Sequence, residues 1–131
     1  MIPRVFLLLL VFTFLFPPFV SACRRTPPHS NITFNYEVTP QPPHVGATTI
    51  DLQLRDAKGQ AVSGAHVETE GNMSHAGMSP VSGVAREIEA GKYRVTLPLT
   101  MAGDWIIVIN ATLANGEHVQ HQIELNGVRS N

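Results

Sequence analysis

The chain has 131 residues, 15% of them charged, and its formal net charge at neutral pH is −1. This length is enough for one domain with its own hydrophobic core. The near-neutral balance, without a basic stripe interleaved with aromatic residues, excludes a nucleic-acid-binding surface of the usual kind.

The N-terminal 22 residues have the pattern of an export signal. Arg4 precedes an almost wholly apolar run at 5–20, which two prolines interrupt. An uncleaved membrane anchor is the alternative interpretation, but the run is short for a span of ~20 residues. A serine and an alanine then precede Cys23, as in a bacterial lipobox. We therefore predict that residues 1–22 are a lipoprotein signal peptide and that Cys23 carries lipid.

This processing predicts an extracytoplasmic protein anchored to a membrane by its N-terminal lipid, at the periplasmic face or in the outer membrane if the host is Gram-negative. Residues 23–30 would be the lipidated cysteine and a polar tether, 31–126 the folded domain and 127–131 a frayed tail. Cys23 is the single cysteine of the sequence. A soft-metal site outside the cytoplasm would therefore use methionine and histidine.

Seven short segments are apolar or alternate between apolar and polar residues, with turn signals between them. They span residues 31–38, 46–55, 64–70, 84–89, 92–97, 105–113 and 118–125. We expect 84–89 to be an edge strand and 105–113 a central strand buried on both faces. Pro98 should end regular pairing, and Asn115-Gly116 predicts a type I′ hairpin. Since no helical stripe occurs, we predict an all-β, immunoglobulin-like antiparallel β-sandwich of about seven strands.

Two predicted loops carry the methionines of the mature chain. One spaces Met73, His75 and Met78 as Met-x-His-x-x-Met between glycines and a proline, and the other holds Met101. Thioether sulfur is a soft, uncharged ligand, and with imidazole it favours Cu(I) over Zn(II). Cu(I) accepts three or four ligands, so these four side chains would be sufficient. The pattern therefore predicts a Cu(I) site.

Two neighbours extend this hypothesis, and one alternative competes with it. His66, on the outer face of the strand before the loop, is an alternate ligand. Trp105 would lie beside the ion without binding it and would shield it with its indole face. In the alternative, the loop methionines fold back over the end of the sandwich, and His75 caps a turn. Spacing alone leaves both interpretations open.

Enzyme signatures are absent from the sequence. The chain has no Gly-x-Ser-x-Gly elbow, no phosphate-binding loop, no His-Glu-x-x-His and, once Cys23 is acylated, no free thiol. Its carboxylates fit solvated strand faces and turns. We therefore predict that the protein is not an enzyme.

Four segments resemble the YtkA-like domain family, which is related to the periplasmic part of FixH-type proteins of cytochrome oxidase assembly. They are Gly-Ala-His-Val at 64–67, Asn-Met-Ser-His-Ala-Gly-Met-Ser-Pro at 72–80, Gly-Lys-Tyr at 91–93 and Met-Ala-Gly-Asp-Trp at 101–105. The likeness covers roughly residues 45–125. It implies a small, membrane-attached, immunoglobulin-like domain linked to copper handling, with the loop methionines and histidine as ligands. The sequence lacks the transmembrane architecture of FixH itself.

These observations support two functional hypotheses. In the first, an extracytoplasmic lipoprotein binds copper, as Cu(I), for buffering, transfer or oxidase maturation, and exchanges it with a copper-donor or copper-acceptor protein. In the second, a non-metal envelope adaptor presents its methionine-bearing loops or an edge strand to another protein.

Overall fold

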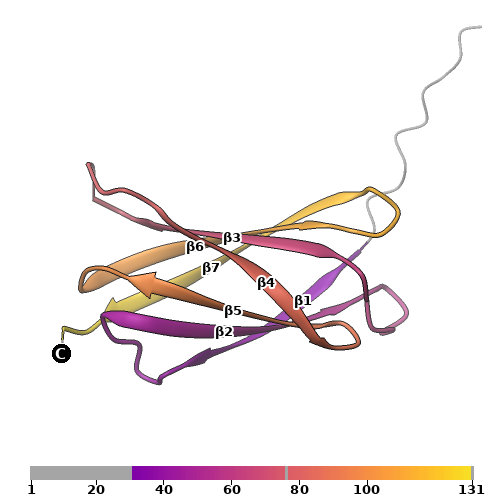
Figure 1. Ribbon diagram of the computed structural model, residues 1–131, viewed down its shortest axis with the longest axis horizontal. Coiled ribbons are helices and arrows are strands. Elements are labelled where there is room, and N and C mark those ends of the chain that lie inside the picture. The colour runs from indigo at the N-terminus through magenta and orange to yellow at the C-terminus, as the bar shows by residue number, and fades with distance from the viewer. Residues whose placement is uncertain (1–30, 76, 131) are drawn as a thin grey trace, which may run out of the picture.

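The computed structural model describes residues 31–75 and 77–130, so the predicted signal peptide, Cys23 and the predicted tether lie outside the described residues. All regular structure in the described part is β (Figure 1). The strands are β1 Thr33–Thr39, β2 Gly46–Arg55, β3 His66–Met73, β4 Val81–Glu89, β5 Lys92–Leu99, β6 Gly103–Thr112 and β7 His118–Val128. Within these residues the structure has no helix long and apolar enough to span a membrane.

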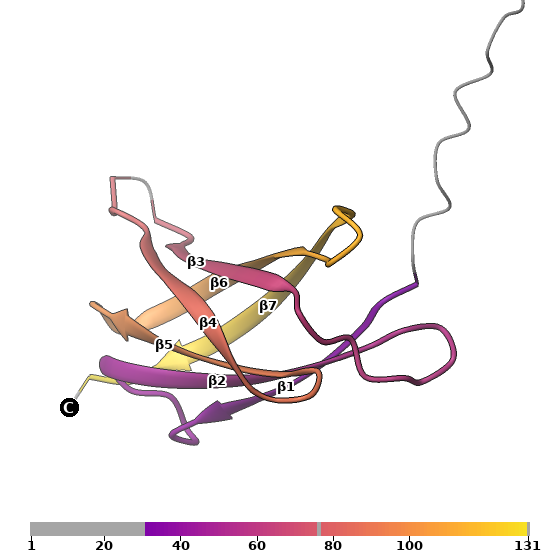
Figure 2. The same ribbon diagram turned by 45° about the vertical axis from the view of Figure 1, so that its right-hand side comes forward.

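The seven strands form one antiparallel sheet in the order β1-β2-β5-β4-β3-β6-β7. Strand β4 joins its two halves, because residues 81–85 pair with β3 and residues 86–89 pair with β5. In both ribbon views β4 runs diagonally from the layer of β3, β6 and β7 to the layer of β1, β2 and β5 (Figures 1 and 2). The predicted all-β, seven-stranded architecture is therefore confirmed, but a separation into two independent sheets is not.

The two edge strands, β1 and β7, meet and nearly close the sheet. The ring of Phe34 stacks on that of His121, with centroids 4.9 Å apart and planes at 3°. At the C-terminal end of β7, the N–H of Val45 donates to the carbonyl of Arg129 at 2.8 Å, and the N–H of Arg129 donates to the carbonyl of Pro43 at 3.0 Å. The predicted frayed tail is therefore wrong for residues 127–129, which strand β7 and these bonds hold.

Alternate residues of each strand point inward and share one core. The largest fully buried side chains are those of Trp105, Tyr93, Ile50, Leu52, Leu54, Leu97, Leu99, Ile107, Ile109 and Ile123. Full burial of one such aliphatic side chain stabilises the fold by about 1.5–3 kcal/mol. The period-2 alternation predicted the inward residues of β2, β7 and residues 92–97 correctly, because successive side chains of a strand point to opposite sides of the sheet.

Three expectations about individual strands were wrong. Strand β4 is not an edge, because it pairs on both sides in different halves. On β6 the outward Ile106 and Val108 are only half-buried, whereas the inward Ile107 and Ile109 are fully buried. Pro98 does not end pairing, because it pairs with Ala47 of β2. On the other side of β5, β4 does not pair with this part of the strand.

The predicted hairpin between β6 and β7 forms with a different turn. Leu113 accepts a bond from the N–H of Gly116 at 2.8 Å and donates its own N–H to Glu117 at 2.8 Å. Gly116 has φ of 84°, whereas no non-glycine residue of the described chain has a positive φ. A type I′ turn needs positive φ at both central residues, so Asn115 excludes it; one left-handed glycine fits a three-residue hairpin loop.

Glu87 and Tyr93 attach the β2–β3 connection to the β4–β5 hairpin. The Glu87 carboxylate accepts backbone N–H bonds from Gly64 and Gly91, both at 3.1 Å. The Tyr93 hydroxyl donates to the carbonyl of Val62 at 2.7 Å and accepts from the N–H of Ala65 at 3.1 Å. The two backbone donors hold the pKa of Glu87 below its ordinary value.

Glu87→Gln is expected to lower stability at pH 7 and to have less effect at pH 3. A carboxyl with a lowered pKa stabilises the fold above the pH where it titrates when unfolded, about 4.3, and that contribution is lost as pH falls through the folded pKa. The loss is modest because the group is exposed and water screens it. Urea midpoints of both proteins at the two pH values measure it, and an equal loss at both would contradict the assignment.

Candidate functional site

The two methionine-bearing connections lie at the same end of the molecule. Figures 1 and 2 show the β3–β4 and β5–β6 connections at the same end of the molecule, where β7 also terminates. Met73 is the last residue of β3, where it pairs with Trp105 of β6, so the expectation that it lies in a loop was wrong. Met101 lies in the loop just before β6 begins at Gly103. Strand pairing therefore fixes the relative position of the two segments.

Met73 packs against the end of the core. It lies on the inward face of β3, is half-buried and contacts the core cluster. Its Cε would be 3.1 Å from a Cβ added at Gly103, whose φ is +127°. Gly103 therefore leaves the space that the thioether methyl occupies. The motif at 101–105 contains this glycine, but only the tertiary structure assigns it that role.

Met101 is held through its backbone while its side chain stays accessible. The residue is 47% exposed. Its carbonyl accepts a hydrogen bond from the indole Nε1–H of Trp105 at 2.9 Å. Trp105 is 1% exposed, so its ring is part of the core and its N–H anchors the loop. Shielding of an ion by the indole face remains a prediction.

The β3–β4 loop carries the other two candidates. His75 is exposed and Met78 is half-buried; residue 76, between them, lies outside the described residues. The loop begins directly after Met73 and projects from the same end as the Met101 loop (Figure 2). The structure thus brings Met73, His75, Met78 and Met101 to one end of the fold, on two neighbouring segments.

His66 does not belong to this group. It lies at the opposite end of β3 from Met73 and pairs with Thr112 rather than with Trp105. A strand rises ~3.3 Å per residue, so the two residues are about 23 Å apart. Its Nε2 lies 3.1 Å from Oε1 of Glu68. The expectation that His66 is an alternate ligand of the methionine loop is therefore wrong.

The predicted ligands at this end are three thioethers and one imidazole, and His44 and Asp104 also lie here, since His44 pairs with Arg129 and Asp104 accepts the N–H of Gly127. Among residues 31–75 and 77–130, no three histidine, cysteine, aspartate or glutamate side chains already converge as a metal site would require. Thioethers are soft ligands that suit Cu(I) and are poor ligands for Ca²⁺ or Mg²⁺. An ion held at this end would therefore depend on the methionines.

The family assignment rests on a comparison with known protein families. The sequence profile of a family described as YtkA-like matches residues 28–110. This range includes both methionine-bearing segments and ends within β6. A comparison with curated proteins finds no match. Because the profile covers well over half of the chain, the protein belongs to the YtkA-like family.

Proposed function

We propose that this protein is an extracytoplasmic lipoprotein that binds Cu(I) as cargo and exchanges it with a donor or acceptor protein, for buffering, transfer or oxidase maturation. Met73, His75 and Met78 would be the principal ligands and Met101 the fourth. The leader, the lipobox-like residues before Cys23 and family membership support the location and the membrane anchor. Ligand exchange suits a site on exposed loops at one end of the domain.

One arrangement carries this proposal: the β3–β6 pairing places Met73 opposite Trp105, and Trp105 holds the carbonyl of Met101 at 2.9 Å. Two thioether-bearing segments are therefore fixed to one rigid strand pair. A soft-metal site needs sulfur atoms from separate segments to be available together, and a fixed backbone lowers the cost of gathering them.

We also infer that the fold is immunoglobulin-like. The order β1-β2-β5-β4 followed by β3-β6-β7 corresponds to strands A-B-E-D and C-F-G of constant-type immunoglobulin domains. The departure from that pattern is β4, which pairs with β3 as well as with β5. The described residues contain no cysteine pair, so the shared core and the backbone pairing of β4 with both layers hold the layers together there.

A Cu(I) titration of residues 24–131 against a chromogenic chelator tests the proposal. We expect one ion per chain, with Met78→Leu weakening the affinity at least tenfold, because leucine keeps most of the apolar volume but removes the sulfur ligand. His118→Ala serves as the control: it removes an exposed imidazole from β7, far from the loops, and should leave Cu(I) affinity unchanged.

The adaptor function is the second candidate, and the exposure of Met101 favours it as a contact surface. Absence of Cu(I) binding at micromolar concentration, or binding that is indifferent to Met78→Leu, would reject the copper proposal. Capture of the same envelope partner by the metal-free wild type and by a Met78→Leu, Met101→Leu double variant would then support the adaptor.

A further inference from the structure

The outer face of β3, β6 and β7 carries carboxylates and histidines without lysine or arginine. The ladder registers place twelve side chains there: His66, Glu68, Glu70 and Asn72 on β3, Ile106, Val108, Asn110 and Thr112 on β6, and His118, Gln120, Gln122 and Glu124 on β7. The outer face of β1, β2 and β5 differs, because Arg94 pairs with Asp51 there. The face of β3, β6 and β7 is therefore the one suited to attract a cation.

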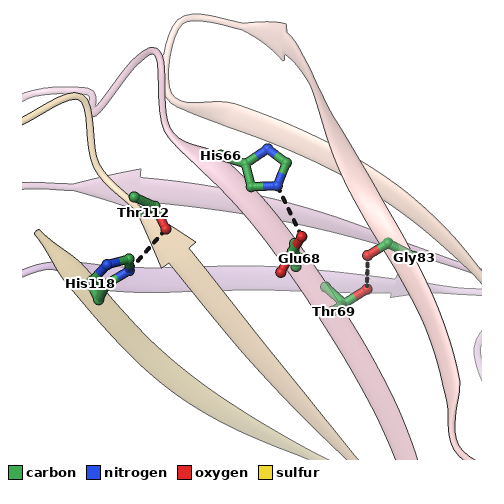
Figure 3. A network of polar contacts seen from close by, with 6 residues as sticks. All are labelled: His66, Glu68, Thr69, Gly83, Thr112 and His118. Carbon is green, nitrogen blue, oxygen red and sulfur yellow. Dashed lines mark hydrogen bonds and ion pairs between the residues drawn. The ribbon is translucent and has the colours of Figure 1, made fainter. Parts of the chain in front are cut away.

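Two histidines of this face lie in one row across three strands. His66 pairs with Thr112, and Thr112 pairs with His118 (Figure 3). Adjacent strands are ~4.8 Å apart, so the Cα atoms of the two histidines are about 10 Å apart. Glu68 follows His66 by two residues and therefore shares its face. His66, Glu68 and His118, whose side chains are of types that bind metals, thus lie close together on one face of the sheet.

The hydrogen bonds of this group leave ligand atoms accessible. Nδ1 of His118 lies 3.0 Å from Oγ1 of Thr112, on the strand between β7 and β3, and His118 is exposed. Nε2 of His66 lies 3.1 Å from Oε1 of Glu68, and these two side chains are 60% and 61% exposed. Exposed side chains change rotamer readily, so the row can contract around an ion without moving the backbone.

We propose that His66, Glu68 and His118 form a surface site for a borderline divalent cation of the Zn²⁺ type. Imidazole and carboxylate are the ligands that Zn²⁺ takes in proteins. At a bond length of about 2.1 Å, two nitrogens on a tetrahedral ion lie about 3.4 Å apart. The ligating nitrogen of each histidine therefore has to lie about a third of the Cα–Cα distance from its own Cα, measured along the line that joins the two Cα atoms.

Solvent can complete the coordination. A shallow groove of about 460 Å³ adjoins the row and is lined in part by Glu68, Glu70 and Asn110. It leaves room for water ligands beside the carboxylate of Glu68. The ion would draw together side chains that do not yet converge in the described residues. The site lies at the opposite end of β3 from Met73, so it does not rest on the proposed copper function.

A calorimetric titration of the protein with ZnSO₄ tests the site. We expect one Zn²⁺ per chain with micromolar affinity, and at least a tenfold loss for His66→Ala and for His118→Ala. His44→Ala is the control, because it removes an imidazole that belongs to neither proposed site and lies at the far end of β7 from His118, so it should change the affinity less than twofold. His66→Gln and His118→Gln keep a polar side chain and should show the same losses.

A localised readout completes the experiment. Paramagnetic Cu²⁺ added at substoichiometric amounts should broaden the amide resonances around residues 66, 112 and 118 and spare those around 73 and 101. Absence of Zn²⁺ binding below ~1 mM, an affinity unchanged by the His118 variants, or broadening confined to the methionine loops would each overturn the proposal.

Discussion

Gly91→Ala is expected to lower the free energy of unfolding by about 2–5 kcal/mol. Gly91 has φ of +71°, and an added Cβ would lie 2.9 Å from Cβ of Ala61 and 3.0 Å from the backbone nitrogen of Val62. The left-handed conformation costs an L-residue about 1–2 kcal/mol, and overpacking costs about 1–3 kcal/mol more. The neighbouring backbone cannot rotate away as a side chain can, so the β2–β3 connection would have to move.

Gly116→Ala separates the two contributions. Gly116 also has a positive φ, +84°, but an added Cβ would meet nothing within 4 Å. We expect this control to lose only the conformational cost, about 1–2 kcal/mol. Urea unfolding monitored by Trp105 fluorescence measures both variants. Equal losses would mean that the close approach at Gly91 contributes nothing.

Trp105→Ala should be the more damaging of two substitutions at the core position beneath the methionine loops. Removal of a buried tryptophan side chain costs about 3–5 kcal/mol, and Trp105 is among the largest fully buried side chains. Trp105→Phe keeps an aromatic ring in the core but loses the hydrogen bond to the carbonyl of Met101. We expect that variant to lose about 1–2 kcal/mol and to stay folded.

The phenylalanine variant also tests whether the indole positions Met101. If Cu(I) binds as proposed, Trp105→Phe should weaken its affinity several-fold, since the loop then has to be ordered upon binding. Competition with a chromogenic Cu(I) chelator, after circular dichroism has verified folding, measures the change. An unchanged affinity would contradict a positioning role for Trp105, while loss of binding in Met78→Leu would still support the site itself.

Trp105 connects the core to the Met101 loop, so its substitution is expected to change both stability and Cu(I) affinity. Trp105 fills the core beside Gly71, where an added Cβ would lie 3.5 Å from its ring, and its N–H holds the Met101 loop. Gly103 leaves space for the methyl of Met73. Packing at this end of β3 and β6 therefore decides where the side chain of Met73 and the backbone of Met101 lie.

The sequence by itself determined the strand pattern and the inward faces of this protein. The alternation of Ile50, Leu52 and Leu54 on β2 is a local property, because the side-chain period of a strand does not depend on its partners. The soft-donor character of the methionine-bearing segments is also set by the sequence, because ligand softness belongs to the residue types themselves. Family membership followed from the same motifs.

Tertiary structure alone decided which strands pair and which side chains meet. Strand β4 changes partner between Ala85 and Arg86, and the nearby Gly83 packs closely against β5, since an added Cβ there would lie 2.8 Å from Val95 Cγ2. No local pattern encodes such a crossing, since it depends on sheet twist and on contacts distant in sequence. For the same reason the sequence grouped His66 with Met73, whereas the register separates them by about 23 Å and places His66 in one row with His118.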